Sequence, residues 1–524
     1  MHPRRARLIL TVLFGALVGC TSGQSAPPGD ERHAMSLKLE LHLARQQIVV
    51  GEDAALTYVL TNTAASPLKI PDPNQNKRWP ELRVKDRKSG KETAFGPFDV
   101  AARGISEFMP VMPEINITLG PRQSTRVEAL LSRRALFDGP GDYELTAAFE
   151  FDGGRAMSDP VRVTIDPLSL RSAEIVGGHS GHNTYRYCAW SHAAGGGSVL
   201  VLTCGSFDQH GHPITPYSNR LTELSYAAQP VISVSPNRLP YPKQWVVWQT
   251  VDDLCGLYVG NGQVQLTTSP QNPGLTRARI VPPVLLDLTG NDGSKPGRGE
   301  VALWTADAGR GRLSIRTFEP DGSLSRGPDF ALGNGELRWG RAAALSGGER
   351  RFALIERSGN ECALSFLTWD GSPGGGAAPQ AVARWLGDVL GAGATLNDND
   401  TLFGAAMLAR PVSGRAEYWL HAWRIAGDGK CGEQPAVEIV PPKDVAFSRA
   451  LVELSPEGNV VSLLHASDGR WFVCNRAGEV EKLPSELAPF GTPIGAFWLH
   501  ESEPFVVMAG RDTGITYQPL HPHH

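Results

Sequence analysis

One short pattern recurs along the larger, C-terminal part of this chain, and that repetition limits the fold more than any other feature. Apolar runs rich in valine, leucine, phenylalanine and tryptophan return every 46 to 55 residues. The runs begin at Val199, Val246, Val301, Phe352, Phe403, Ala450 and Ala496. Further strand-like runs lie between them, followed by turn residues at Asp321-Gly322, Asp370-Gly371, Asp428-Gly429 and, as a variant, Arg476-Ala477-Gly478. Each unit therefore has room for about four short strands.

A period of this length is typical of one four-stranded blade of a β-propeller. Each unit leaves its apolar faces exposed unless a neighbour covers them, so a closed ring is the arrangement that buries them all. Seven run starts predict seven blades over residues 168–524, with six or eight blades as alternatives. A tandem of β-sandwiches is the competing interpretation, although such domains rarely share one strand pattern at so short a period. Because long amphipathic helices are nearly absent, we expect an all-β protein.

Residues 37–167 precede the repeats and show a different alternation. Leucine occupies every second position of residues 37–43, and a second strand-like run at 55–62 follows a glycine-containing turn. A Gly-Pro-Gly-Asp turn leads into Tyr143, and residues 159–165 supply a closing strand. This segment resembles bacterial immunoglobulin-like domains, in which a turn delivers a tyrosine into the penultimate strand, and the resemblance implies a β-sandwich. The charged, proline-rich stretch 71–104 is predicted to be a long loop.

The composition of the 524-residue chain is that of an ordinary globular protein, with 41% hydrophobic residues. Its 50 basic and 54 acidic residues are well mixed and leave a formal net charge of −4. No basic field exists to attract nucleic acid, so we exclude nucleic-acid binding. The chain length allows two or three domains.

The N-terminus contains a basic, apolar leader that ends in a cysteine. Arg4, Arg5 and Arg7 precede residues 8–19, an uncharged run that suits an export signal and is too short to span a membrane. Leu17, Val18, Gly19 and Cys20 close this run.

These four residues resemble the lipobox of a bacterial lipoprotein signal peptide. The resemblance implies removal of residues 1–19 and attachment of acyl chains, such as palmitate, at Cys20. An ordinary secretory leader with a chance cysteine is the alternative. Residues 20–36 form a polar tether, and Thr21, which is not aspartate, implies the outer membrane under the enterobacterial sorting rule. We therefore expect a lipid-anchored protein of the cell envelope, with its orientation left open.

Six further cysteines form an even set, which in an exported chain predicts disulfides with fifteen conceivable connectivities. They are Cys188, Cys204, Cys255, Cys362, Cys431 and Cys474. Cys188 and Cys204 lie on adjacent strand-like runs joined by a short turn at residues 193–197, so we predict that they form a disulfide. Metal ligation by these thiols is the weaker interpretation, because no Cys-x-x-Cys spacing occurs.

Asp287, Asn291 and Asp292 are the candidate metal ligands of the repeat region. Their segment resembles the calcium loops of integrin-type FG-GAP propeller repeats, where alternating oxygen ligands precede a strand. Residues 396–400 are the candidate for a second copy. Insertion 294–299 breaks the usual spacing, so a solvated polar turn competes with the calcium hypothesis. Apart from calcium at this segment, we expect no cofactor.

Histidines around the first repeat could gather at a zinc or copper ion, although loop histidines that only form hydrogen bonds are commoner. They are His179, His182, His192, His210 and His212. A serine hydrolase is not supported at Ser180, because His182 stands where the nucleophile elbow needs a glycine.

Three functional hypotheses follow. The first is an envelope lipoprotein without catalytic residues whose propeller is a binding or assembly scaffold for a protein or glycan. The second is a propeller enzyme, a hydrolase, lyase or dehydrogenase, acting on envelope or extracellular polysaccharide. The third is a structural protein of the cell surface without a ligand. Acidic residues near strand ends, which the sequence does not place in a common cleft, are Asp252, Asp253, Glu356, Asp398 and Glu453.

Overall fold

The computed structural model describes residues 36–74, 80–96, 115–131, 137–180, 183–194, 197–207, 213–224, 230–235, 244–249, 254–260, 263–268, 278–287, 298–307, 310–319, 323–372, 378–500 and 503–520. These residues are almost entirely strands and turns, with one short 3₁₀ helix at η2 (Ser485–Phe490). The prediction of an all-β protein is confirmed. Within the described ranges, no helix has the length and apolar character that a membrane span requires.

Two main sheets and one small one form the N-terminal unit, residues 36–168. The first sheet has the order β1-β3-β8, comprising β1 (Leu37–Leu43), β3 (Ala55–Asn62) and β8 (Ser124–Leu130). The second has the order β2-β11-β9-β5-β6, with β10 beside β9. Its strands are β2 (Gln47–Val49), β5 (Glu81–Asp86), β6 (Glu92–Phe95), β9 (Gly141–Phe151), β10 (Gly154–Met157) and β11 (Val161–Asp166). The small sheet pairs β4 (Leu68–Pro71) with β7 (Asn116–Leu119).

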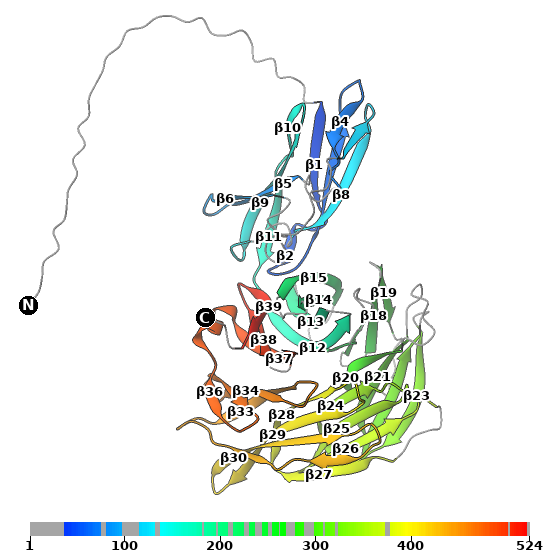
Figure 1. The fold of residues 1–524 in the computed structure, drawn as a ribbon, viewed down its shortest axis with the longest axis vertical. Coiled ribbons are helices and arrows are strands. Elements are labelled where there is room, and N and C mark those ends of the chain that lie inside the picture. Colours follow the sequence, from blue (N-terminus) through cyan, green and yellow to red (C-terminus); the bar gives the residue numbers. More distant parts are fainter. Residues whose placement is uncertain are drawn as a thin grey trace, which may run out of the picture.

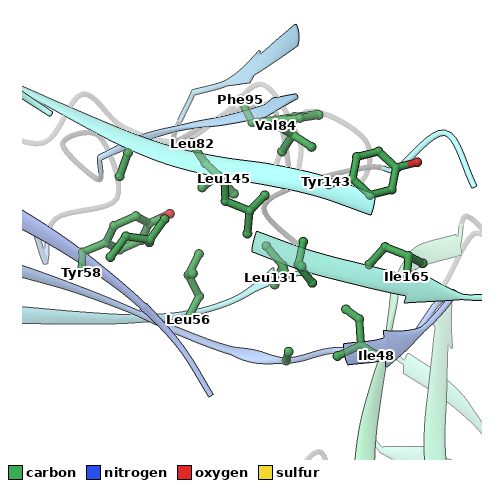
Figure 2. Close-up of a cluster of buried hydrophobic side chains, with 14 of the residues drawn as sticks. Ile48, Leu56, Tyr58, Leu82, Val84, Phe95, Leu131, Tyr143, Leu145 and Ile165 are labelled. Carbon is green, nitrogen blue, oxygen red and sulfur yellow. The ribbon is translucent and has the colours of Figure 1, made fainter. Parts of the chain in front are cut away.

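Alternation along these strands builds one apolar core between the two main sheets (Figure 2). Leu56 and Tyr58 of β3 are fully buried, and Leu145 of β9 meets them from the other sheet. The predicted loop over residues 71–104 is wrong in part, because β5 and β6 pair within it. Leu82 and Val84 alternate with polar residues and enter the core, and this period of two is the signal that the charge of the segment obscured.

The described residues after 168 form seven antiparallel sheets in chain order, and each is built from consecutive strands (Figure 1). The first sheet contains β12 (Leu170–Ser180), β13 (Asn183–Ala194), β14 (Gly197–Phe207) and β15 (Pro213–Leu224), and the second contains β16 (Val231–Val234), β17 (Gln244–Gln249), β18 (Leu254–Gly260) and β19 (Gln263–Thr268). The third contains β20 (Arg279–Asp287), β21 (Arg298–Asp307), β22 (Arg310–Phe318) and β23 (Leu324–Ala331). The fourth contains β24 (Glu336–Ala344), β25 (Arg350–Ser358), β26 (Glu361–Trp369) and β27 (Gln380–Leu386). The fifth sheet contains β28 (Asp388–Leu396), β29 (Leu402–Val412), β30 (Arg415–Ile425), β31 (Cys431–Glu433) and β32 (Val437–Ile439). The sixth contains β33 (Phe447–Leu454), β34 (Val460–Ala466), β35 (Trp471–Asn475) and β36 (Val480–Lys482). The seventh contains β37 (Thr492–His500), β38 (Glu503–Gly510) and β39 (Gly514–Pro519).

The first strands of these sheets form a closed cycle. Each contacts the first strand of the next sheet, in the order β12, β16, β20, β24, β28, β33 and β37, and β37 contacts β12 again. Sheets of sequential antiparallel strands, arranged around a ring of their first strands, define a β-propeller. The first strands are therefore the inner strands of the ring, and the apolar side chains of neighbouring sheets pack between them.

Glycines let the inner strands approach closely where the ring is tightest. A Cβ atom on Gly391 of β28 would lie 2.0 Å from the carbonyl oxygen of Ala450 on β33, and one on Gly393 would lie 2.0 Å from that of Val452. Any side chain here would force the two backbones apart.

The repeated runs of the sequence do correspond to strands of successive sheets. They do not all fall at the same position within a sheet, because the connections between strands differ in length. Val199 lies on the third strand of its sheet, whereas the next four run starts lie on second strands and the last two on first strands. The turns predicted at Gly371, Gly429 and Gly478 are confirmed by positive φ angles of 88°, 81° and 86°. Asp321-Gly322 lies outside the described residues.

The N-terminal unit is joined to the first and seventh sheets by buried polar contacts. The backbone N–H of Asp53 donates to the carbonyl of Ser218 on β15 (2.9 Å), and the Ser218 N–H donates to the Asp53 carboxylate (2.9 Å). Leu168 N–H donates to the carbonyl of Arg511 in the β38–β39 turn (2.8 Å). One apolar cluster extends from the N-terminal sheets to Trp190 and Phe497, so the two parts share a core.

Candidate functional site

Four charged side chains gather inside the ring, and we call them the axial cluster. Glu174 lies on β12, Arg186 on β13, Arg341 on β24 and Glu453 on β33. Three of these four strands, β12, β24 and β33, are inner strands of the ring. Glu174 follows Ala173 and precedes Ile175, and Arg341 stands between Gly340 and Ala342, so each charged group interrupts a strand-like run.

The Arg341–Glu174 contact spans the interior of the ring. Their strands, β24 and β12, are not neighbours in the cycle, because β16 and β20 lie between them. Even so, Arg341 Nη1 lies 3.9 Å from Glu174 Oε1, a separation that satisfies an ion pair but exceeds a hydrogen bond. The side chains keep exposed fractions of 26% and 22%, so solvent still reaches both.

Arg186 links the first sheet to the seventh. Its Nη2 donates to the carbonyl of Trp498 on β37 (2.5 Å), and its guanidinium lies 4.9 Å from the ring centre of Phe497. The Nε atom is buried and has no partner among the described residues. Gly177 makes room for this side chain, because a Cβ there would lie 1.5 Å from Arg186 Nη1.

The surroundings shift the titration of both carboxyls in the same direction. Burial raises the pKa of Glu174 to about 7, the Arg341 guanidinium opposes that rise, and the charge of Glu453 adds to it. Burial likewise raises the pKa of Glu453 to about 7, against the attraction of Arg341 and Arg186. Both groups thus change protonation near neutral pH.

This symmetry bears on what the axial cluster can do chemically. A pair of carboxyls that divides acid and base roles is normally recognised by environments that push the two pKa values apart. Here both pKa values rise together, and the four charges consist of two guanidiniums and two carboxyls. The arrangement can hold a ligand through charge and hydrogen bonds. It lacks the difference in pKa between two carboxyls that is typical of a glycosidase.

The predicted Cys188–Cys204 disulfide is wrong. The two cysteines do lie on paired strands, β13 and β14, but Cys188 faces Thr203 and Cys204 faces Tyr187. This offset of one residue sends the two thiols to opposite faces of the sheet, where they enter different apolar cores. All six described cysteines are free thiols, and Cys431 is the exposed one among them.

The predicted calcium ligands are not brought together by any described contact. Asp287 ends β20, whereas Asn291 and Asp292 lie outside the described residues, so calcium binding there stays a prediction. In the candidate second copy, Asn397 Oδ1 accepts from the backbone N–H of Asn399 (3.0 Å) and of Thr401 (2.9 Å). That segment is a polar turn, and Asp400 within it also accepts from the backbone N–H of Ser346 (2.8 Å).

The remaining predicted site residues have separate locations. Glu453 joins the axial cluster, while Glu356 is buried against Trp304, whose Nε1 lies 3.4 Å from Glu356 Oε1. His192 is buried beside the carbonyl of Ala193 (3.0 Å). The lipobox residues, Asp252, Asp253, His182, His210 and His212 lie outside the described residues. Sequence analysis missed Glu174, Arg186 and Arg341, although a charged residue within an apolar strand run was a signal available for each.

No family model matches the sequence, and no curated protein matches it either. Solved structures show loose likenesses. The β-propeller domain of the trilobed protease from Pyrococcus furiosus is 10% identical with a TM-score of 0.34, covering 68% of this chain and 97% of that one. Polysaccharide lyase Uly1 is 10% identical with a TM-score of 0.37, covering 67% and 89%.

The alkylpurine DNA glycosylase AlkC of Pseudomonas fluorescens is 17% identical with a TM-score of 0.16, and the match covers 25% of this chain and 30% of that one. This chain therefore spans less than a third of that enzyme. Because these TM-scores are all below 0.5, the propeller architecture rests on the sheet order and on the contacts between inner strands.

Proposed function

We propose that this chain is a lipid-anchored protein of the bacterial cell envelope whose propeller is a binding or assembly scaffold for a protein or glycan. In this proposal residues 1–19 are removed, Cys20 carries the acyl chains, and residues 20–36 connect the anchor to the folded part. The outer membrane is the proposed location. The motivating feature is the run of Leu17, Val18, Gly19 and Cys20 after a basic, apolar leader.

We further infer that residues 37–167 are an immunoglobulin-like sandwich. The hydroxyl of Tyr143 on β9 donates to the carbonyl of Gly139 (2.8 Å), four residues earlier in the turn before that strand. This bond resembles the tyrosine corner of immunoglobulin-like folds and supports the inference. Residues 168–524 would then form seven blades, one for each of the seven sheets, with a three-stranded last blade.

The observation that carries the scaffold proposal is the joint between the N-terminal unit and the ring. Glu52 is fully buried there, and Arg220 on β15 donates to both of its carboxylate oxygens, at 2.8 and 3.0 Å. A protein that presents a surface to a partner at a set distance from a membrane benefits from a joint that does not bend. Two partly buried hydrogen bonds from one guanidinium fix that geometry.

Photo-cross-linking from chosen surface positions tests the scaffold proposal. A photoreactive residue placed at exposed Arg384 or Lys430 of the propeller should capture one defined partner in membrane preparations. The same group at exposed Lys91 or Glu128 of the N-terminal unit is the matched control and should not. Capture from the control positions alone, or from none of the four, would contradict a scaffold and favour the structural alternative.

The anchor has its own test. The Cys20→Ser variant should leave the membrane fraction after salt washing, while the unmodified chain stays. Retention of the variant would show that the lipoprotein proposal is wrong.

A propeller enzyme acting on polysaccharide is the second candidate, and the observation that favours it is the pair Glu174 and Glu453 inside the ring. Because both pKa values rise together, this candidate stays second. Turnover of an envelope polysaccharide that disappears in both Glu174→Gln and Glu453→Gln variants would reverse the order.

A further inference from the structure

The charged groups of the axial cluster form fewer hydrogen bonds and ion pairs than they could. Arg341 has no hydrogen-bond acceptor among the described residues, and its contact with Glu174 is 3.9 Å long. Glu174 and Glu453 likewise have no hydrogen-bond donor within the described part of the chain. Solvent still reaches Arg341 and Glu174, so their unused donors and acceptors are accessible to a ligand. Most of the unused hydrogen-bonding capacity therefore belongs to Arg341, whose partly exposed guanidinium points across the ring.

The net charge of the axial cluster depends on which of its groups can become neutral near pH 7. Arg341 and Arg186 remain cations at any physiological pH. Burial raises the pKa of Glu174 and of Glu453 to about 7, so each carboxyl is more often neutral as pH falls below 7. The axial cluster is therefore net positive from neutral pH downward, and it repels a cationic ligand.

We propose that the axial cluster binds a small organic carboxylate, with the Arg341 guanidinium facing the ligand and Glu174 and Glu453 donating hydrogen bonds to it. The inference rests on the propeller being a binding module, and it does not depend on the lipid anchor. It supplies the chemical class of a ligand that the scaffold proposal leaves open.

Carboxylate is the anion that these groups match best. The planar fork of a guanidinium donates two parallel hydrogen bonds to a carboxylate. A neutral carboxyl group donates one short hydrogen bond to a carboxylate oxygen.

The pH response of the axial cluster comes from its two glutamates, because the other titratable groups nearby do not change charge near neutral pH. The Cys188 thiol interacts with Glu174, and the Tyr517 phenol interacts with Arg186 and with Cys188 and Cys204. Burial raises the pKa of both Cys188 and Tyr517, so these groups stay neutral between pH 5 and 8. Binding should therefore weaken as pH rises through about 7, when the carboxyl donors become anions.

Calorimetric titration of the full mature chain in detergent tests the inference, with D-glucuronate as the probe and D-glucose as its uncharged match. We expect binding of glucuronate and none of glucose, with an affinity about tenfold weaker at pH 8 than at pH 6. Arg341→Gln should weaken binding at least tenfold. Arg338→Gln, on the same strand but paired with Asp388, is the control and should leave affinity unchanged.

Glu174→Gln separates a binding role from a folding role. A glutamine keeps a hydrogen-bond donor at every pH, so this variant should retain affinity at pH 6 and lose less of it at pH 8. Equal binding of glucose, preference for D-glucosamine or inorganic phosphate, or equal loss in the Arg338→Gln variant would overturn the inference. Absence of glucuronate binding while cross-linking from Arg384 or Lys430 persists would overturn the carboxylate site and leave the scaffold proposal standing.

Discussion

Glu52 and Arg220 lie on opposite sides of the boundary between the N-terminal unit and the propeller, and the guanidinium donates to both carboxylate oxygens, at 2.8 and 3.0 Å. Arg45 adds a third contact at 2.8 Å, and the Val49 N–H donates a fourth at 3.1 Å. The carboxylate has no exposed surface, so these four donors replace its water. The boundary is thereby held by chemistry that neither part could complete alone.

Replacing Arg220 with methionine should loosen this boundary. Glu52 would keep Arg45 but lose two donors, and we expect the free energy of unfolding to fall by about 2–4 kcal/mol. Chemical denaturation should then show a lower midpoint or two separate transitions. Arg126→Met removes an exposed ion pair with Glu128 and should cost at most about 0.5 kcal/mol. Equal effects of the two substitutions would show that the buried contact contributes nothing special.

The axial cluster should make stability depend on pH. The folded state raises the pKa of Glu174 and Glu453 from the ordinary 4.5 to about 7, so it holds their protons more tightly than the unfolded chain does. Their stabilisation is complete below about pH 4.5 and is lost as pH rises through 7. From pH 5 to pH 8 we expect a loss of about 2–4 kcal/mol, reduced by the solvent that still reaches these side chains.

The Glu174→Gln, Glu453→Gln double variant isolates this contribution. Its free energy of unfolding, measured with urea across the same pH range, should fall less steeply than that of the unchanged protein. Parallel slopes would mean that other groups cause the pH dependence.

Gly391 should not tolerate a side chain. Gly391→Ala would place a methyl group 2.0 Å from the carbonyl oxygen of Ala450, so β28 and β33 would have to separate. We expect a loss of about 2–4 kcal/mol in the free energy of unfolding. Gly347→Ala is the control, because nothing lies within 4 Å of that position, and it should change stability by no more than about 0.5 kcal/mol. Thermal melts of the two variants should differ clearly, and matching melts would count against the tight approach of the inner strands.

Thiol labelling should find one accessible cysteine in the folded protein. Cys431 is exposed and the other five described cysteines are buried, so in a Cys20→Ser background a maleimide should modify one thiol before unfolding and six after it. Mass spectrometry without reductant counts the modified thiols. Four modified thiols after unfolding would indicate a disulfide and reinstate a pairing that the register of β13 and β14 opposes.

Local patterns predicted the elements well where one face of a strand is buried. The alternating leucines of residues 37–43 coincide with β1, and the run at 55–62 coincides with β3. In the repeats, the Asp-Gly turns at Gly371 and Gly429 were predicted because a positive φ angle favours glycine. The Cys188–Cys204 prediction failed by one residue, because periodicity marks a strand but does not set its register against the next.

The sequence by itself determined the all-β class, the recurrence of strand groups, and the alternation that builds the N-terminal core. These follow from propensities and periods that act over a few residues. Only the tertiary structure decided the axial cluster and the Glu52–Arg220 joint, since Glu174 meets Arg341 across the ring and Glu52 meets Arg220 across a boundary between two parts. Closing a ring of sheets joins residues far apart in the chain, and no local pattern carries that information.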